Sequence, residues 1–209
     1  MSKTNEIKIL VVDDHPVVRF GMTAFLNAQR NMKVIGEAAT GEVAVKLFRK
    51  HQPDVVLMDL RLPGMSGVDA IRAIRSEYPQ SRFVVMTTYE GEEDIYQALE
   101  AGAQAYLIKC MPSETLVDAI IKVNAGLRVI PPAVARSLAM RAPNFSLTDR
   151  ERDVLLLIVK GNSNKEIASK LGITEGTVKC HVNVILSRMG VSDRTQAAIA
   201  ALQRGIVHL

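Results

Sequence analysis

The sequence has only two cysteines and no apolar run long enough to cross a membrane. Cys110 and Cys180 cannot form a disulfide framework, and no Cys or His spacing indicates a zinc site. The segment Met1–Lys8 is polar, and the apolar run Ile9–Val12 is too short for a signal peptide or a membrane span. These absences argue against the secreted, zinc-binding and membrane-spanning classes. We therefore expect a soluble cytoplasmic protein that does not bind membranes.

An excess of positive charge occurs only toward the C-terminus. Residues 1–128 contain 15 Lys and Arg against 16 Asp and Glu, whereas residues 147–209 contain 9 against 6. The length of 209 residues allows one large domain or two small ones. A weakly acidic first part joined to a basic end indicates a C-terminal domain that meets nucleic acid, a signal that needs support from motifs.

Strand and helix patterns alternate five times in the first part of the chain. The expected strands are residues 7–12, 33–37, 54–59, 83–87 and 105–108. Each is a short apolar run followed by an amphipathic helical pattern, which is typical of a parallel sheet covered by helices on both faces. The predicted fold class is an α/β doubly wound five-stranded parallel sheet.

Polar side chains gather where these strands end. Asp13 and Asp14 close the first strand, Asp59 the third, Thr87 the fourth and Lys109 the fifth. In a parallel sheet these ends meet at one edge, where open α/β sheets place their sites. Each residue has a plainer explanation, as a helix cap, a strand residue or a solvated lysine, but their joint occurrence at one edge favours a site.

The residue types suggest metal-assisted phosphoryl chemistry. Neighbouring carboxylates repel one another unless a cation joins them, and hard oxygen ligands suit Mg²⁺. A carboxylate such as Asp59 can attack a phosphoryl donor to give an aspartyl phosphate. Lys109 would hold the phosphoryl charge, and Thr87 would donate a hydrogen bond to one of its oxygens.

Three motifs in this part resemble the receiver domain of two-component response regulators, over about residues 6–126. They are Val11-Val12-Asp13-Asp14-His15, Leu57-Met58-Asp59-Leu60-Arg61-Leu62-Pro63-Gly64 and Ala105-Tyr106-Leu107-Ile108-Lys109, together with Thr87. The resemblance implies a flavodoxin-like fold. It also implies that a sensor histidine kinase phosphorylates Asp59.

The resemblance assigns further roles around Asp59. Asp14, Asp59 and the backbone carbonyl of Arg61 are implied ligands of Mg²⁺, with Asp13 acting mainly through water. Thr87 and Tyr106 are the implied switch pair, and Lys109 and Thr88 complete the residues expected around the phosphoryl group. The chain departs from many receivers at Lys109-Cys110, where those relatives have proline after a cis peptide bond.

The C-terminal part shows four helical patterns. Thr148 with Glu151 and Ser163 with Glu166 form two capping boxes, each ahead of a short helix. A third helix is expected from Glu175 to about Met189, and a fourth from near Asp193. Two short helices joined by a turn with glycine indicate a helix-turn-helix, and a plain four-helix interaction module is the alternative.

Three motifs of this part resemble the LuxR-type DNA-binding domain, over about residues 146–207. They are Leu147-Thr148-Asp149-Arg150-Glu151-Arg152-Asp153-Val154-Leu155, Ser163-Asn164-Lys165-Glu166-Ile167-Ala168 and Thr177-Val178-Lys179-Cys180-His181-Val182. Joined to a receiver, this domain implies the NarL/FixJ family of response regulators. The resemblance implies a transcription factor that binds promoter DNA as a homodimer when phosphorylated.

The expected domains are a receiver at 1–126, a linker with a short helix at 127–146, and a helix-turn-helix domain at 147–209. In the third helix of that last domain, apolar residues from Val178 to Met189 form a core-facing stripe, and the opposite face would enter the DNA major groove. The residues expected to contact DNA are Lys165, Thr177, Lys179, Cys180, Asn183 and Arg194.

Two other functions compete with this interpretation. A hydrolase with an aspartyl nucleophile commonly has a second Asp two residues after the first, whereas this chain has Arg61 there. A LuxR-type regulator that senses a small molecule would show a ligand pocket in place of the acidic cluster. We therefore expect no enzyme activity beyond self-catalysed phosphorylation and dephosphorylation. Phosphorylation could relieve inhibition by the receiver or mainly drive dimerisation.

Overall fold

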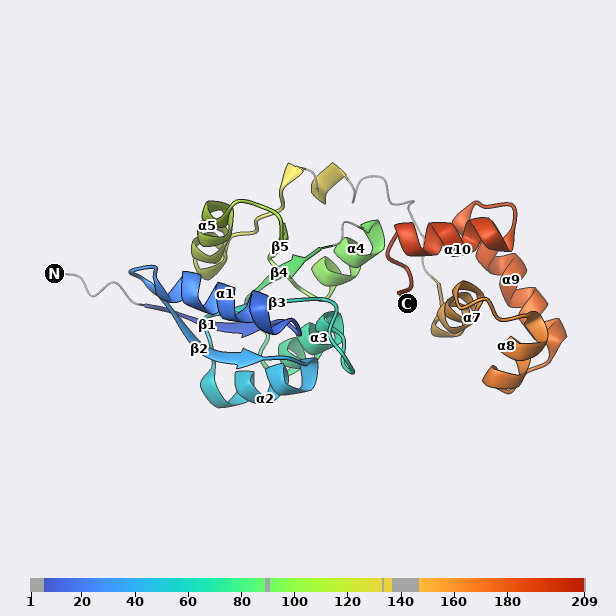
Figure 1. The fold of residues 1–209 in the computed structure, drawn as a ribbon, viewed down its shortest axis with the longest axis horizontal. Coiled ribbons are helices and arrows are strands. Elements are labelled where there is room, and N and C mark those ends of the chain that lie inside the picture. Colours follow the sequence, from blue (N-terminus) through green and yellow to red (C-terminus); the bar gives the residue numbers. More distant parts are fainter. Residues whose placement is uncertain (1–5, 89–90, 133, 137–146, 209) are drawn as a thin grey trace. The chain divides into compact units, whose positions relative to one another are not determined.

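A computed structural model of the chain describes residues 6–88, 91–132, 134–136 and 147–208. These residues form two compact units, one with five strands and their helices and one with the four C-terminal helices (Figure 1). Each unit has its own buried apolar core. No helix among the described residues is both long enough and apolar enough to cross a membrane.

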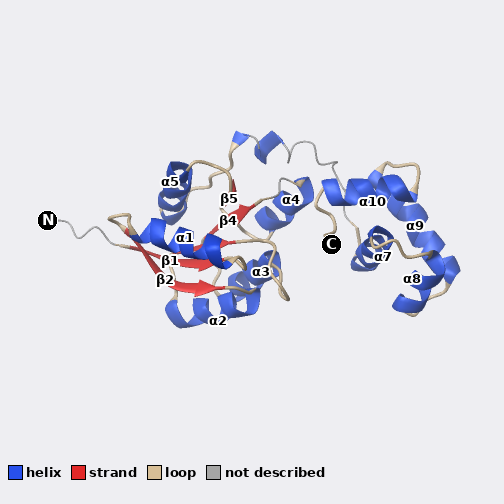
Figure 2. Cartoon of the chain, in the orientation of Figure 1, coloured by secondary structure: helices blue, strands red, loops and turns tan. Residues whose placement is uncertain are grey.

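The larger unit is built on one five-stranded parallel sheet (Figure 2). Its strands are β1 (Ile7–Val12), β2 (Met32–Ala38), β3 (Val55–Met58), β4 (Phe83–Thr87) and β5 (Ala105–Ile108). They lie in the order β2-β1-β3-β4-β5 and every pair is parallel. This confirms the predicted fold class. The strand order reverses direction between β1 and β3, which is where doubly wound sheets open a crevice.

Four helices of this unit connect the strands, and a fifth follows β5. They are α1 (Pro16–Asn27), α2 (Gly41–His51), α3 (Gly67–Glu77), α4 (Glu92–Glu100) and α5 (Ser113–Asn124). The helix starts are set by local chemistry: Thr40 accepts a hydrogen bond from the Val43 N–H, and Ser66 accepts one from Asp69. The bounds of β1, β4 and β5 coincide with those expected from the sequence.

Alternate residues of each strand face opposite sides of the sheet. Ile9 and Val11 of β1 and Leu57 of β3 join a core cluster that includes Leu26 of α1 and Ile120 of α5. On α2, the ring of Phe48 stacks near Phe83 of β4, with centroids 6.5 Å apart. Because helices cover both faces of the sheet, a functional site can form only at the ends of its strands.

Three details differ from the expected boundaries. Strand β2 extends one residue beyond each end of the expected 33–37. Strand β3 is shorter than residues 54–59, because Asp54 and Asp59 lie just outside it; Asp54 instead accepts a hydrogen bond from the Lys8 N–H. Val129, which falls in the expected linker, forms a parallel bridge with Ala105 of β5. The chain thus pairs with the edge strand β5 once more, two residues before Pro131.

The expected linker falls only partly within the described residues. Helical backbone is described at Pro132 and 134–136. The remainder of the expected short helix, and the Arg141–Asn144 segment, lie outside the described residues.

The smaller unit contains α7 (Asp149–Val159), α8 (Asn164–Leu171), α9 (Glu175–Met189) and α10 (Arg194–Gln203). Both expected capping boxes are present, each with reciprocal hydrogen bonds between the cap and a glutamate. Helix α8 ends at Gly172, whose φ of +64° is a left-handed conformation that favours glycine, and Thr174 then caps α9. The tight α8–α9 turn gives the helix-turn-helix, and α7 and α10 complete its core.

Candidate functional site

The acidic site lies at the C-terminal edge of the sheet. Asp13 follows β1, Asp59 follows β3, and Lys109 follows β5, while Thr87 is the last residue of β4. The backbone pairing extends one step past the strands, since Asp59 N–H donates to the Val12 carbonyl at 2.9 Å and Lys109 N–H to that of Thr87 at 2.8 Å. This pairing fixes the backbone from which the functional side chains project.

Lys109 joins two buried carboxylates. Its Nζ lies 2.7 Å from Oδ2 of Asp13 and 2.6 Å from Oδ2 of Asp59. Asp13 is only 1% exposed and Asp59 only 4%. Burial of two negative charges is costly, and the ammonium group, with its two short charge-assisted hydrogen bonds, offsets part of that cost.

The pKa values of the site show incomplete charge compensation. Burial raises the pKa of Asp59 above its usual value, with a smaller contribution from Asp13, although the Lys109 ammonium acts in the opposite direction. For Lys109, burial is the largest single influence and lowers the pKa, but the hydrogen bonds to Asp13 and Asp59 together outweigh it, so its pKa is raised. Lys109 therefore stays protonated. Because Lys109 does not fully offset the effect of burial on Asp59, a further positive charge would stabilise the ionised carboxylate.

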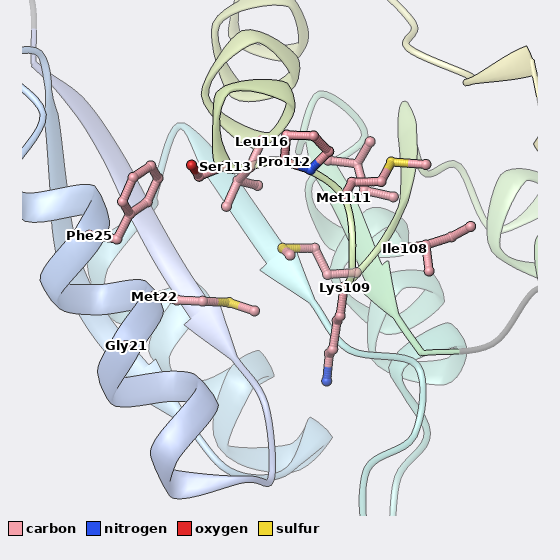
Figure 3. A pocket seen from close by; sticks show the side chains of 11 residues that line it. Gly21, Met22, Phe25, Ile108, Lys109, Met111, Pro112, Ser113 and Leu116 are labelled. Atoms are coloured by element: carbon pink, nitrogen blue, oxygen red, sulfur yellow. The ribbon is translucent and has the colours of Figure 1, made fainter.

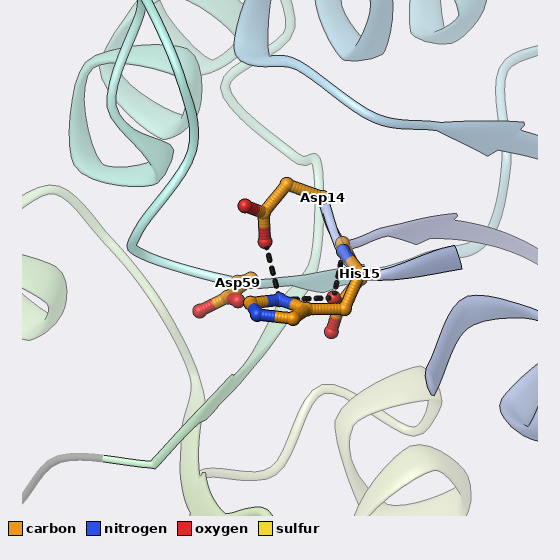
Figure 4. A group of neighbouring side chains, drawn as sticks. Asp14, His15 and Asp59 are labelled. Carbon is orange, nitrogen blue, oxygen red and sulfur yellow. Dashed lines mark hydrogen bonds and ion pairs between the residues drawn. The ribbon is translucent and has the colours of Figure 1, made fainter. Parts of the chain in front are cut away.

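Asp14 and His15 extend this cluster toward solvent (Figure 4). His15 Nδ1 lies 2.6 Å from Oδ1 of Asp14 and 3.5 Å from Oδ1 of Asp13. Despite that short contact, Oδ1 of Asp14 is buried and has no hydrogen bond of acceptable geometry to any described residue. A buried carboxylate oxygen in that position is suited to coordinate a cation.

The cluster fits the donor set of a hard divalent cation. One ligand atom from each of four residues lies within 4.8 Å of the others, and the residues are Asp13, Asp14, His15 and Asp59. Three of these donors are carboxylates, which Mg²⁺ prefers. The Arg61 N–H donates to Oδ1 of Asp59 at 3.3 Å, which keeps the backbone of Arg61 next to this carboxylate.

Helix α2 holds the loop after β3. The Met65 N–H donates to Oε1 of Glu42 at 2.9 Å. Hydrogen bonds from the Glu42 backbone, from Thr40 and from Met65 lower the pKa of the Glu42 carboxyl, so it stays ionised. Sequence reasoning missed Glu42, because nothing in the local pattern shows that a residue 23 positions before Met65 would contact it.

Sequence reasoning also missed two residues near Asp13. The sequence included His15 in the first motif, next to Asp14, but indicated no role for it. Arg19 of α1 donates from its guanidinium to the Asp13 carbonyl at 2.6 Å, which pins the backbone of the acidic loop. Nothing in the local pattern singles out Arg19, which lies six residues after Asp13.

The expected switch residues have contrasting environments. Thr87 is 1% exposed and Tyr106 is fully buried, whereas Thr88 is exposed. The Tyr106 ring thus already occupies an inward position in this structure.

An apolar cavity of about 230 Å³ lies beside the Lys109 stem (Figure 3). Its walls come from α1 and from the β5–α5 connection, and include Met22, Phe25, Met111 and Leu116. The carbon chain of Lys109 lines it, while the Lys109 ammonium is engaged by Asp13 and Asp59.

No described peptide bond is cis, and this includes the bond between Lys109 and Cys110.

Helix α9 separates an apolar face from an exposed one, as its periodicity predicts. Val178, Ile185 and Met189 are buried, and Val182 and Leu186 pack against the same core. The exposed residues include four of those expected to contact DNA, namely Thr177, Lys179, Cys180 and Asn183. A helix with polar side chains on one exposed face is suited to a DNA groove.

The two remaining candidates for DNA contacts differ from each other. Lys165 on α8 is exposed. Arg194 is half-buried, and its guanidinium donates to the Asn162 carbonyl at 2.7 Å and to Oδ1 of Asn164 at 3.5 Å. Arg194 therefore links α10 to the start of α8. This structural role does not depend on a contact between Arg194 and DNA.

A buried glutamate sets the position of α9. Oε2 of Glu151 accepts from the Thr148 N–H at 2.8 Å and from the Arg188 guanidinium at 2.7 Å. One carboxylate, 5% exposed as a residue, thus caps α7 and fixes the last turn of α9. The capping role of Glu151 was predictable from sequence, whereas its contact with Arg188 was not.

Comparison with known proteins assigns both units. Residues 9–121 match the family model for the response regulator receiver domain, and residues 145–201 match that for bacterial regulatory proteins of the luxR family. The response regulator protein VraR of Staphylococcus aureus is 40% identical over 206 residues, with 96% of this chain and 99% of VraR covered.

Solved structures agree with this assignment. The crystal structure of the response regulator ChrA of a heme-sensing two-component system is 36% identical, with a TM-score of 0.58, and covers 97% of this chain and all of ChrA. A structure of the response regulator RcsB in complex with DNA shares the fold at 23% identity, with a TM-score of 0.67 and with 95% of this chain and 99% of RcsB covered. The chain belongs to the response regulators of two-component systems that join a receiver domain to a LuxR-type helix-turn-helix domain.

Proposed function

We propose that the chain is a phosphorylation-controlled transcription regulator whose acceptor is Asp59 and whose DNA-binding element is α9. The observation that supports this most strongly is the buried pair of carboxylates, Asp13 and Asp59, held by one lysine ammonium at 2.7 and 2.6 Å. The pair occurs in the same chain as an exposed polar helix face of a helix-turn-helix. The phosphoryl donor is a sensor histidine kinase, and the target is promoter DNA.

The chemical step is an in-line transfer. A carboxylate oxygen of Asp59 attacks the phosphorus, the bond between phosphorus and the donor histidine nitrogen breaks, and that nitrogen keeps the bonding electron pair. Lys109 holds the charge that develops on the phosphoryl oxygens, and Thr87 donates a hydrogen bond to one of them. When bound, Mg²⁺ would be held by Asp13, Asp14, Asp59 and the Arg61 carbonyl and would neutralise the negative charge that gathers there.

The phosphoryl group changes the charge of the site. It adds about −1.5 to −2 at neutral pH, next to Lys109 and the buried Thr87. Thr87 moves toward the new oxygens, and the packing around Tyr106 and Thr88 adjusts with it. This favours homodimer formation and DNA binding. The chain has no enzyme activity on other substrates; it catalyses only its own phosphorylation and dephosphorylation.

The full chain tests the proposal directly with beryllofluoride, an analogue of the phosphoryl group. We expect beryllofluoride with Mg²⁺ to convert the chain to a dimer in light scattering and to tighten its binding to duplexes selected from a randomised library. A small-molecule-sensing regulator would not respond, and a hydrolase would turn over the donor instead of retaining it. Unchanged mass and unchanged DNA affinity would contradict the proposed function.

A second prediction separates base contacts from phosphate contacts. Asn183→Ala should weaken binding to the preferred duplex by ~1–3 kcal/mol and leave random DNA nearly unaffected, because asparagine can pair with adenine through two hydrogen bonds. Lys165→Ala should weaken all sequences alike and reduce the slope of log K against log salt by ~1.

Fluorescence anisotropy at several salt concentrations provides the measurement. Lys46→Ala, an exposed lysine of α2 in the other unit, is the matched control for Lys165. Replacement of Arg194 is less informative, because it also removes the hydrogen bond to Asn162 that ties α10 to α8. Equal losses on preferred and random DNA for Asn183→Ala would remove Asn183 from the base-contacting residues.

A further inference from the structure

Val184 is an apolar side chain on the outer face of α9. It is 38% exposed, and at about 100° per residue it lies about 40° around the helix from Cys180. Apart from Cys180, the other exposed positions on this face are small, polar or charged, namely Gly176, Thr177, Asn183, Ser187 and Arg188. Val184 therefore interrupts a surface that is otherwise suited to water or to hydrogen-bonding partners.

Packing within the described residues does not account for a valine at this position. Val178 and Ile185 are fully buried in the core of the unit, whereas Val184 belongs neither to that core nor to the side chains packed against it. A β-branched residue also has a lower helix propensity than alanine or lysine. Neither core packing nor helix formation thus favours valine at position 184.

Cys180 extends this apolar surface by one helical turn. It is a free, exposed cysteine, which behaves as a small and weakly polar side chain. Residues at i and i+4 place their Cβ atoms ~5–6 Å apart on the helix surface. Cys180 and Val184 therefore form one continuous apolar spot. Asn183 and Lys179, which carry hydrogen-bonding groups, both lie on one side of it.

The DNA major groove offers one apolar group that matches such a spot, the C5-methyl of thymine. Small apolar side chains contact it, whereas cytosine at the same place presents an amino group and no methyl. We propose that Val184, packed beside Cys180, is a specificity-determining residue that contacts thymine methyl groups. This inference rests on the proposed function of α9 as the helix that enters the major groove.

The geometry also limits where the thymine lies. Asn183 and Val184 are adjacent on α9, and successive bases on a strand are ~3.4 Å apart along the duplex axis. The thymine contacted by Val184 therefore lies within one or two base pairs of the base contacted by Asn183. The preferred duplex of this chain contains a thymine at that position in each half-site.

Replacement of thymine by deoxyuridine tests the proposal, because it removes only the methyl group. The full chain, with beryllofluoride and Mg²⁺, is titrated with the highest-affinity duplex recovered from the randomised library. Single deoxyuridines then replace each thymine in turn. We expect wild type to lose affinity about fourfold at one position per half-site, which is ~0.8 kcal/mol or one buried methyl group.

Val184→Ala should bind the thymine duplex about fourfold more weakly than wild type and show no further loss with deoxyuridine at that one position. Its losses at other thymines should match those of wild type. Val43→Ala is the matched control, since Val43 on α2 is also a helical valine and is 39% exposed. It should keep the full thymine preference of wild type.

Three results would overturn the inference. One is a Val184→Ala variant that retains the full deoxyuridine loss at every position. Another is wild-type binding that is insensitive to all deoxyuridine replacements. The third is a loss of thymine preference in Cys180→Ala but not in Val184→Ala, which would assign the contact to Cys180 alone. If the wild-type chain selected no duplex from the library, the proposed function of α9 itself would fail, and this outcome is distinct from the other three.

Discussion

Replacement of Asp59 by asparagine is expected to abolish labelling of the full chain by acetyl phosphate and Mg²⁺. The neutral amide is a poor nucleophile, and no other described carboxylate lies as close to Lys109 except Asp13. The measurement is the phosphoryl group that the chain retains, detected on a phosphate-sensitive gel or by mass spectrometry. Normal Mg²⁺-dependent labelling of Asp59→Asn would rule out Asp59 as the acceptor.

The Asp59→Asn chain should remain folded, which keeps the result interpretable. Burial and the Asp13 charge both raise the pKa of Asp59, so its ionised form is disfavoured in the folded protein. Asparagine removes that charge, and Lys109 keeps its ion pair with Asp13. We therefore expect a thermal unfolding midpoint no lower than that of wild type.

Two further variants provide a control for this prediction and a test of the metal ligands. Asp118→Asn is the control, since Asp118 pairs with Lys122 on the exposed surface of α5 and should label at the wild-type rate. Asp14→Ala should fold normally but need more Mg²⁺ and label more slowly, because it removes the buried oxygen that fits a cation. Wild-type Mg²⁺ dependence in Asp14→Ala would exclude Asp14 from the metal ligands.

The second large effect is expected at Gly67, the first residue of α3. A Cβ at this position would lie 2.0 Å from the Asp59 carbonyl oxygen and 2.8 Å from the Leu60 Cα. Backbone atoms cannot rotate away as a flexible side chain does, so Gly67→Ala must displace either α3 or Asp59. Overpacking of this kind typically costs ~1–3 kcal/mol and sometimes more.

Gly67→Ala should therefore lower both the stability of the larger unit and the rate of Asp59 labelling. Hydrogen exchange of the β3 amides reports the local loss, which a global unfolding curve of a two-unit chain would obscure. The control is Gly21→Ala in the middle of α1, where a Cβ meets no atom within 4 Å. It should stabilise the protein by ~0.5–1 kcal/mol, since alanine favours a helix. Wild-type exchange and labelling in Gly67→Ala would show that the loop adapts without cost.

Much of the fold was predictable because it depends on short-range patterns. Buried parallel strands are continuous apolar runs, so the bounds of β4 and β5 follow directly from composition. The two capping boxes follow from residues three positions apart. The core-facing stripe of α9 follows from the helical repeat. Boundaries were less predictable at β3, where the side chain of Asp54 accepts a hydrogen bond from the first strand.

The composition of the acidic site was also predictable, since strand order and parallel pairing bring the strand ends to one edge. Its contacts were not. Lys109 meets Asp59 across 50 residues, and Glu42 meets the Met65 N–H across 23. Only the packed structure determines which charged groups come within hydrogen-bond distance, because those distances depend on the relative placement of several elements at once.

The sequence by itself thus determined the sheet, the helix-turn-helix and the candidates for phosphoryl transfer and DNA contact, since each depends on local periodicity, capping or a short motif. Tertiary structure alone decided which of these candidates also hold the fold. It gave Arg194 a partner on α8, tied Glu151 to Arg188, and left Val184 exposed beside Cys180. The physical reason is that burial and long-range pairing are properties of the packed chain, and side chains of the same type acquire different roles according to what surrounds them.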